Sequence, residues 1–78
     1  MRRPGRRIQY ESHVLRRMQQ RNINEDQVAQ VVRRPQANRP AKREGARRLE
    51  RNLTRKKRLA VIVEETDDVT RIVSAFWM

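Results

Sequence analysis

One histidine and two arginines recur at intervals of four residues near the start of the chain: His13, Arg17 and Arg21. On a helix, residues four apart lie on the same face, so this spacing predicts one stripe of three side chains. Guanidinium groups suit phosphate oxygens, and an imidazole can transfer a proton near neutral pH. The stripe therefore has groups that phosphodiester cleavage needs. The alternative is that His13 hydrogen-bonds a strand carbonyl while the arginines are solvated or paired with carboxylates.

The chain as a whole is strongly basic, with 20 Lys or Arg against 9 Asp or Glu and a formal net charge of +11 over 78 residues. The excess is concentrated in residues 33–58, where Glu44 and Glu50 are the only acidic residues. Such clustering is typical of proteins that bind a nucleic-acid backbone, and RNA or another polyanion is the expected partner. The expected contacts are Arg47, Arg48, Arg51, Arg55, Lys56, Lys57 and Arg58. A solvated basic surface without such a partner is the alternative.

Several classes of site are excluded or disfavoured by composition. The chain has no cysteine, which excludes disulfides and thiolate metal sites, and its single histidine argues against a zinc site. We therefore expect no metal and no cofactor. No apolar run approaches the about 20 residues that span a membrane. The charged N-terminus is not followed by an apolar stretch, so its pattern differs from that of a secretory signal. The expected location is therefore the cytoplasm.

The expected organisation is a disordered basic arm over residues 1–7 and a single domain over residues 8–78. A first helix is predicted over residues 12–20, with Ser12 as its N-cap. Val14, Leu15 and Met18 form its narrow apolar stripe. Asn22 then ends the helix, because asparagine tolerates the left-handed conformation that often follows a helix.

A second helix has clearer boundaries. Asn24 is the expected N-cap, and Gln27 stands three residues later, which is the spacing of a capping box. Ile23 and Val28 have the spacing of a hydrophobic staple around that cap. Pro35 is expected to stop this helix. The segment 35–45, with two prolines and Gly45, is predicted to be a long mobile connection.

Strands are predicted over residues 47–53, 58–64 and 69–77, with a further short one over residues 8–10. The expected fold is therefore an α+β domain in which two N-terminal helices pack on a three- to four-stranded antiparallel sheet. Leu49 and Leu53 fall on one face of the first long strand. The face away from the helices is expected to be open, with basic residues at its edges.

The stretch from His13 to Ile23 resembles the opening of a small bacterial family, the domain of unknown function 4258. That family begins with the pattern His-Ala-x-x-Arg-Met-x-x-Arg-Gly-Ile. Val14 and Asn22 depart from it, standing where the pattern has alanine and glycine. The spaced valines before Pro35 and the last two strands resemble the rest of the family, so the likeness covers about residues 7–77.

The family is similar in outline to RelE/ParE-like toxins, which implies a RelE-like fold and, beyond that, endoribonuclease activity without a metal ion. The residues that carry over are His13, Arg17, Arg21 and, in the last strand, Ser74. In that scheme His13 transfers protons, the two arginines stabilise the charged phosphorane, and Ser74 hydrogen-bonds a non-bridging oxygen. A second proton-transfer group is needed, and the residues leave open whether Glu50, Tyr10 or an arginine serves.

Three functions thus remain open: a toxin-like endoribonuclease that leaves 2′,3′-cyclic phosphate ends, a nucleic-acid-binding module without catalysis, and an interaction protein. In the third case an acidic, antitoxin-like protein would neutralise the basic surface. Fold likeness alone does not decide among them.

Overall fold

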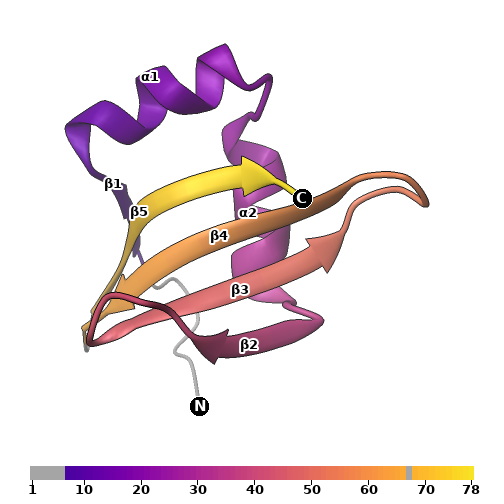
Figure 1. The fold of residues 1–78 in the computed structure, drawn as a ribbon. Helices are drawn as coiled ribbons and strands as arrows, with labels where there is room; N and C mark the ends of the chain where they lie inside the picture. The colour runs from indigo at the N-terminus through magenta and orange to yellow at the C-terminus, as the bar shows by residue number, and fades with distance from the viewer. Residues whose placement is uncertain (1–6, 67) are drawn as a thin grey trace.

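Two helices and five strands make up the part of the chain that the computed structural model describes, residues 7–66 and 68–78 (Figure 1). In chain order the elements are β1 (Arg7–Tyr10), α1 (Ser12–Gln20), α2 (Glu25–Arg33), β2 (Ala37–Pro40), β3 (Ala46–Asn52), β4 (Arg58–Glu65) and β5 (Val69–Trp77). Most of the predicted basic arm, residues 1–6, lies outside the described residues, and Arg7 is the first residue of β1. No helix in the described part is long and apolar enough to cross a membrane.

The strands form one sheet in the order β1-β5-β4-β3-β2. β1 runs parallel to β5, with Arg7 opposite Val69, and every other neighbouring pair in this sheet is antiparallel. The predicted α+β class is confirmed, but the expectation of three to four antiparallel strands is wrong, because the sheet has five strands and is mixed. The pairing of the first strand with the last is a long-range contact that local sequence patterns do not reveal.

The strand that the sequence did not predict is β2, within the segment expected to be a mobile connection. It pairs antiparallel with β3, from Ala37 opposite Glu50 to Pro40 opposite Arg47. Proline is tolerated here because β2 is an edge strand and Pro40 is its last residue. Gly45 adopts a φ of 82° in the turn that returns the chain to β3, a conformation that glycine takes without steric cost.

The first helix, α1, has the predicted bounds but a different cap. Its N-cap is Glu11 rather than Ser12, and no side chain caps it by a hydrogen bond. Of the predicted apolar stripe, Val14 and Met18 are buried, but Leu15 is 46% exposed. Leu15 lies about 100° round the helix from Val14, away from the sheet. After the helix, Asn22 has a φ of 57°, the left-handed conformation expected of it.

The second helix, α2, has the capping box that its sequence predicts. The side chain of Asn24 accepts from the Gln27 N–H at 2.8 Å, and the Gln27 side chain accepts from the Asn24 N–H at 2.9 Å. The helix ends at Arg33, two residues before Pro35. Its buried face consists of Val28, Val31 and Val32.

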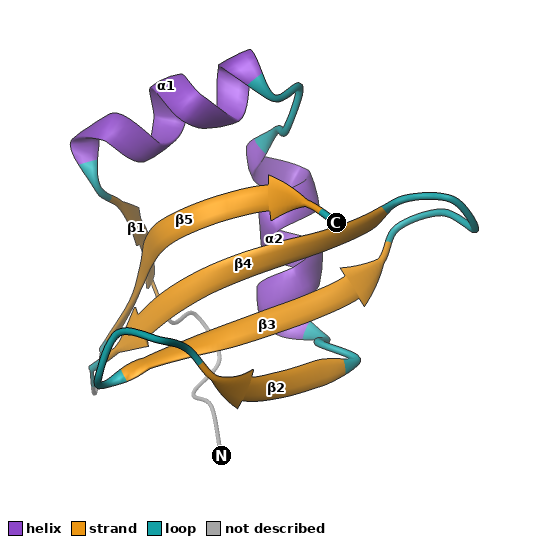
Figure 2. Cartoon of the chain, viewed as in Figure 1, coloured by secondary structure: helices purple, strands orange, loops and turns teal. Residues whose placement is uncertain are grey.

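The hydrophobic core lies between the helices and one face of the sheet. In the packing, α2 lies against β3 and β4, and α1 lies against β5 (Figure 2). Alternation along β4 sends Leu59, Val61 and Val63 into this core. Among the described elements no helix covers the other face of the sheet, which we call the open face (Figure 2).

Candidate nucleic-acid interface

The open face is built from side chains that alternate with the core residues of the strands. The register places Glu50 and Phe76 on either side of Ala60, a small residue that leaves room for both neighbours. The next row along the strands contains Arg39, Arg48, Ile62 and Ser74. Basic, apolar and hydroxyl groups are therefore mixed on one surface.

Three arginines from three strands surround one buried carboxylate on this face. Glu50 in β3 is only 2% exposed. Arg48 Nε donates to Glu50 Oε2 at 2.8 Å, and Arg58 Nε donates to Oε1 at 3.2 Å. Arg39 Nη2 lies 3.7 Å from Oε1. We call this group the arginine cluster. It has one negative charge against three positive ones, so it presents a net positive charge to solvent.

The charge state of Glu50 follows from these contacts. Burial raises the pKa of its carboxyl, but the hydrogen bonds from Arg48 and Arg58 and the nearby charge of Arg39 outweigh that effect. The result is a pKa below the ordinary value of 4.5. Glu50 is therefore ionised at neutral pH, and its oxygens are occupied by arginines. This makes it a structural anchor and a poor choice for the second proton-transfer group.

Arg48 is held on two sides. Besides its bond to Glu50, the centre of its guanidinium lies 5.1 Å from the centroid of the Phe76 ring, within the range of a cation–π contact. The two contacts restrict the guanidinium to one position over the sheet. An ordered arginine of this kind is ready to bind a planar or anionic group without first losing side-chain entropy.

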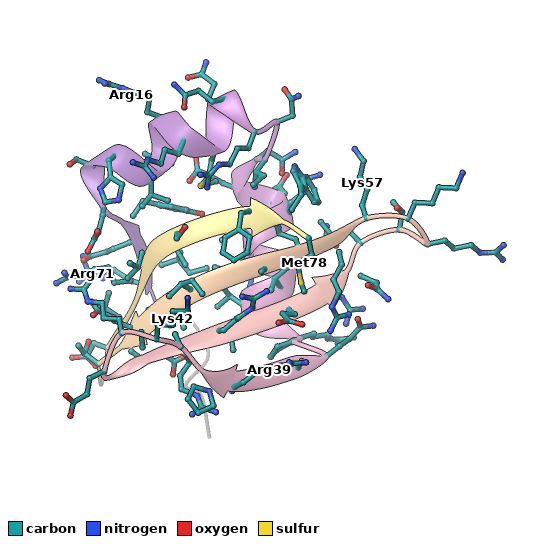
Figure 3. The ribbon with its side chains drawn as sticks, in the orientation of Figure 1. Arg16, Arg39, Lys42, Lys57, Arg71 and Met78 are labelled. Atoms are coloured by element: carbon teal, nitrogen blue, oxygen red, sulfur yellow. The ribbon has the colours of Figure 1, made fainter. Side chains whose placement is uncertain are left out.

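A second polar group borders the open face where β1 meets β5. His13 at the start of α1 is exposed, and its Nε2 lies 3.8 Å from Glu11 Oε2. Glu11 Oε1 in turn lies 3.5 Å from Arg71 Nη1. These residues line a shallow pocket of about 370 Å³ together with Gln9, Tyr10 and Ser12. We call it the His13 pocket. Arg71, which lines it, is labelled in Figure 3.

The His13 pocket contains a candidate for the second proton-transfer group that sequence reasoning missed. Glu11 is a carboxylate two residues before His13, and it lies within reach of both His13 and Arg71. Tyr10 is a weaker candidate because burial, together with the charges of Glu25 and Asp26, raises the pKa of its phenol above 10.0. Tyr10 therefore remains protonated at neutral pH and does not serve as a base.

The predicted stripe of His13, Arg17 and Arg21 is only partly assembled. Arg17 is exposed on α1, one turn after His13. Arg21 lies at the far end of the helix, about 12 Å along its axis from His13 at 1.5 Å per residue. Its Nη1 donates to the Ala75 carbonyl at 2.8 Å, and its own carbonyl accepts from Trp77 Nε1 at 2.7 Å. Arg21 thus ties the end of α1 to β5, away from the His13 pocket.

Ser74 lies on the open face opposite Ile62, in the row of the arginine cluster. Arg71, which belongs to the His13 pocket, lies opposite Glu64 in the same strand pair. Glu64 is two residues from Ile62 along β4, a separation of about 7 Å at 3.3 to 3.4 Å per residue. The two sites therefore share the open face, and Ser74 lies in the same row as Arg48, with Ile62 between them.

The predicted phosphate contacts on β3 are divided between the two faces of the sheet. Arg48 points to the open face, whereas Arg47 and Arg51 alternate to the side of the helices. Arg47 Nε donates to Asn38 Oδ1 at 2.8 Å, and Arg51 Nη1 donates to the Arg34 carbonyl at 2.9 Å. The structure therefore brings Arg48 and Arg58 together with Arg39. Arg39 lies in the segment that was predicted to be a mobile connection.

The remaining predicted contacts lie in the hairpin between β3 and β4, which projects from the sheet (Figure 3). Arg55, Lys56 and Lys57 are exposed there. The Thr54 hydroxyl orders the turn by accepting from the N–H groups of Lys56 and Lys57 at 3.3 and 3.1 Å. Lys57 Nζ lies 5.2 Å from the centroid of the Trp77 ring. The hairpin adjoins the arginine cluster through Arg58.

Comparison with known families supports the resemblance seen in the sequence. Residues 10–77 match the domain of unknown function 4258. The chain belongs to this family. No curated protein and no solved structure matched it. The description of this family assigns no activity to it.

Proposed function

We propose that this protein of the domain of unknown function 4258 family acts on RNA, which it binds by its phosphate backbone across the open face. The observation that carries the proposal is the arginine cluster, in which Arg39, Arg48 and Arg58 surround Glu50. Guanidinium groups suit phosphate because they are planar and offer two parallel donors. Glu50 fixes their positions while leaving the cluster positively charged.

The same surface supports a second candidate function, cleavage of the bound RNA. The observation that favours it is the His13 pocket, where an imidazole, a carboxylate and a guanidinium lie side by side. This arrangement supports a metal-independent endoribonuclease, the activity that the sequence resemblance implies. His13 and Glu11 are the two proton-transfer groups of this candidate, and Arg71 and Arg17 contact the phosphate.

In this reaction the 2′-oxygen attacks the adjacent phosphorus while its proton passes to a base. The bond from phosphorus to the 5′-oxygen breaks, and that oxygen takes a proton from an acid. The products are a 2′,3′-cyclic phosphate and a 5′-hydroxyl. The guanidiniums stabilise the charge that develops on the phosphorane oxygens.

Binding is tested by fluorescence anisotropy with single-stranded RNA over a range of salt concentrations. Each lost phosphate contact lowers the slope of log affinity against log salt concentration by about one in magnitude. The double variant Arg39→Gln with Arg58→Gln is therefore expected to lower this slope by about two. The matched control replaces Arg47 and Arg51, which alternate to the other side of β3. Equal losses in the two double variants would contradict a site on the open face. Weak RNA binding by the wild type, with an acidic protein co-purifying, would favour the interaction protein instead.

Cleavage is tested with end-labelled RNA in the presence of a chelator. The expected result is a ladder of products with cyclic phosphate ends, reduced about 10²- to 10⁴-fold by His13→Ala or Glu11→Gln. Gln20→Ala, at an exposed position on α1 outside the His13 pocket, is the matched control. Intact RNA that remains bound in a salt-sensitive way would reject this second function and keep the first.

A further inference from the structure

Phe76 is the one aromatic side chain that faces the open surface among the residues that the structure describes. Tyr10 packs against the core, and so does Trp77, whose indole N–H donates to the Arg21 carbonyl at 2.7 Å. Phe76 instead lies opposite Ala60, whose small side chain leaves the ring partly exposed. The open face therefore has a single ring, close to the arginine cluster.

The ring and the Arg48 guanidinium form one unit. The guanidinium centre lies 5.1 Å from the ring centroid, and its Nε is fixed by Glu50 Oε2 at 2.8 Å. Aromatic rings and guanidinium planes are the two kinds of surface on which proteins stack unpaired bases. Here both are present at one place and are ordered by a buried carboxylate.

Donors for phosphate flank this unit on the same face. The Arg39 side chain is 62% exposed and the Arg58 side chain is 28% exposed, and both are held near Glu50. A nucleotide whose base lies on Phe76 and Arg48 would have guanidiniums available for its neighbouring phosphates. Charge alone would bind any polyanion, but a stacking surface adds a requirement for an accessible base.

We infer that Phe76 and Arg48 form a stacking site for one unpaired base, so that the protein selects single-stranded over double-stranded RNA. This inference rests on the proposed binding of RNA across the open face. Bases within an A-form duplex are paired and stacked, and their faces cannot reach a sheet surface. The phosphates of a duplex remain available to the arginines, so duplex RNA is bound by charge alone.

The experiment compares two labelled oligomers with the same number of phosphates, oligoadenylate and a chain of abasic ribose phosphates. Stacking is worth about 1–3 kcal/mol per base, so the wild type is expected to bind oligoadenylate about 5- to 150-fold more tightly. Fluorescence anisotropy at one salt concentration gives both dissociation constants. A blunt-ended duplex of two fully complementary strands with the same number of phosphates should bind like the abasic chain.

Phe76→Leu is expected to bring the ratio of the two affinities close to one, because it removes the ring and keeps an apolar side chain. Phe76→Tyr keeps the ring and should keep the ratio. This variant shows whether any substitution at this position changes the ratio. Leu15→Ala, at an exposed apolar residue on α1, should also keep it.

Equal affinity of the wild type for both oligomers would overturn the stacking site and leave binding by charge in place. A ratio that survives in folded Phe76→Leu would overturn the assignment to Phe76. Failure of the wild type to bind either oligomer would overturn the proposed function as well, so the two failures are distinguishable.

Discussion

Arg48 donates its Nε–H to the buried Glu50 carboxylate at 2.8 Å, although the two residues are only two apart on one strand. Residues at this spacing point to the same face, so the pair lies side by side on the open surface. Arg58 from the next strand completes a second contact with the same carboxylate. One glutamate therefore both stabilises this part of the sheet and orients the groups proposed to bind RNA.

Glu50→Gln is expected to reduce the free energy of unfolding by about 2 kcal/mol, since hydrogen bonds to charged groups contribute roughly 1.5 to 3 kcal/mol. The substitution keeps one oxygen acceptor but removes the charge that balances the arginines. Urea unfolding followed by circular dichroism measures the change.

Glu64→Gln is the matched control for that substitution. Its carboxylate also contacts two arginines, Arg43 at 3.0 Å and Arg71 at 3.9 Å, but it is 24% exposed. Ion pairs with exposed partners contribute about 0 to 1 kcal/mol, so a smaller loss is expected. Equal losses of unfolding free energy in the two variants would show that the contribution of Glu50 to stability does not depend on its burial.

The depressed pKa of Glu50 predicts how stability depends on pH. A carboxyl whose pKa is lower in the folded state contributes stability that is fully present above its unfolded pKa, ordinarily 4.5. This contribution is lost as the pH falls through the folded pKa. The difference in unfolding free energy between wild type and Glu50→Gln should therefore be constant near neutral pH and shrink below 4.5. A difference that grows under acid conditions would contradict the prediction.

Arg21→Ala is expected to act on stability, with a loss of about 1.5 to 3 kcal/mol for a hydrogen bond from a charged donor. Its guanidinium holds the Ala75 carbonyl, so the end of α1 would loosen from β5. Arg17→Ala, at an exposed position on the same helix, should change stability by less than about 0.5 kcal/mol. Thermal unfolding of both variants checks the contrast, and loss of RNA cleavage in a fully stable Arg21→Ala would instead assign Arg21 to the chemistry.

The features that could be predicted from the sequence are those set by neighbours along the chain. The capping box of Asn24 and Gln27 is a local spacing, and the helix that it begins lies where it was expected. The left-handed conformation of Asn22 is equally local. By contrast, β2 was not predicted because it contains a proline, and Pro40 disfavours a central strand but not the end of an edge strand.

The proposed RNA-binding surface was harder to predict because it depends on pairing between distant strands. Arg71 approaches Glu11 only because β1 pairs with β5, which no local pattern records. One signal was available, however. Leu49 and Leu53 were expected on one face of their strand, and an apolar face of this kind packs on the core. Alternation then sends Arg47 and Arg51 to that side and Arg48 to the other.

We expect the proposed RNA site to extend from the open face onto the hairpin between β3 and β4. Arg55 and Lys56 are exposed at its tip, close in sequence to Arg58 of the arginine cluster. Replacing both with glutamine should lower the steepness of the salt dependence of RNA binding by about two. Stability should stay within about 0.5 kcal/mol of the wild type, as is usual for exposed positions.

The control for the hairpin is the pair Arg16→Gln with Arg33→Gln, which removes the same charge from exposed positions on α1 and α2. A loss of RNA affinity confined to the hairpin variant would mean that the bound strand runs from the open face along the hairpin. Both variants lose the same net charge. Equal losses of RNA affinity in the two would therefore mean that the hairpin acts only through the protein's net charge. An unchanged salt dependence in the hairpin variant would mean that the bound RNA contacts the sheet and not the hairpin.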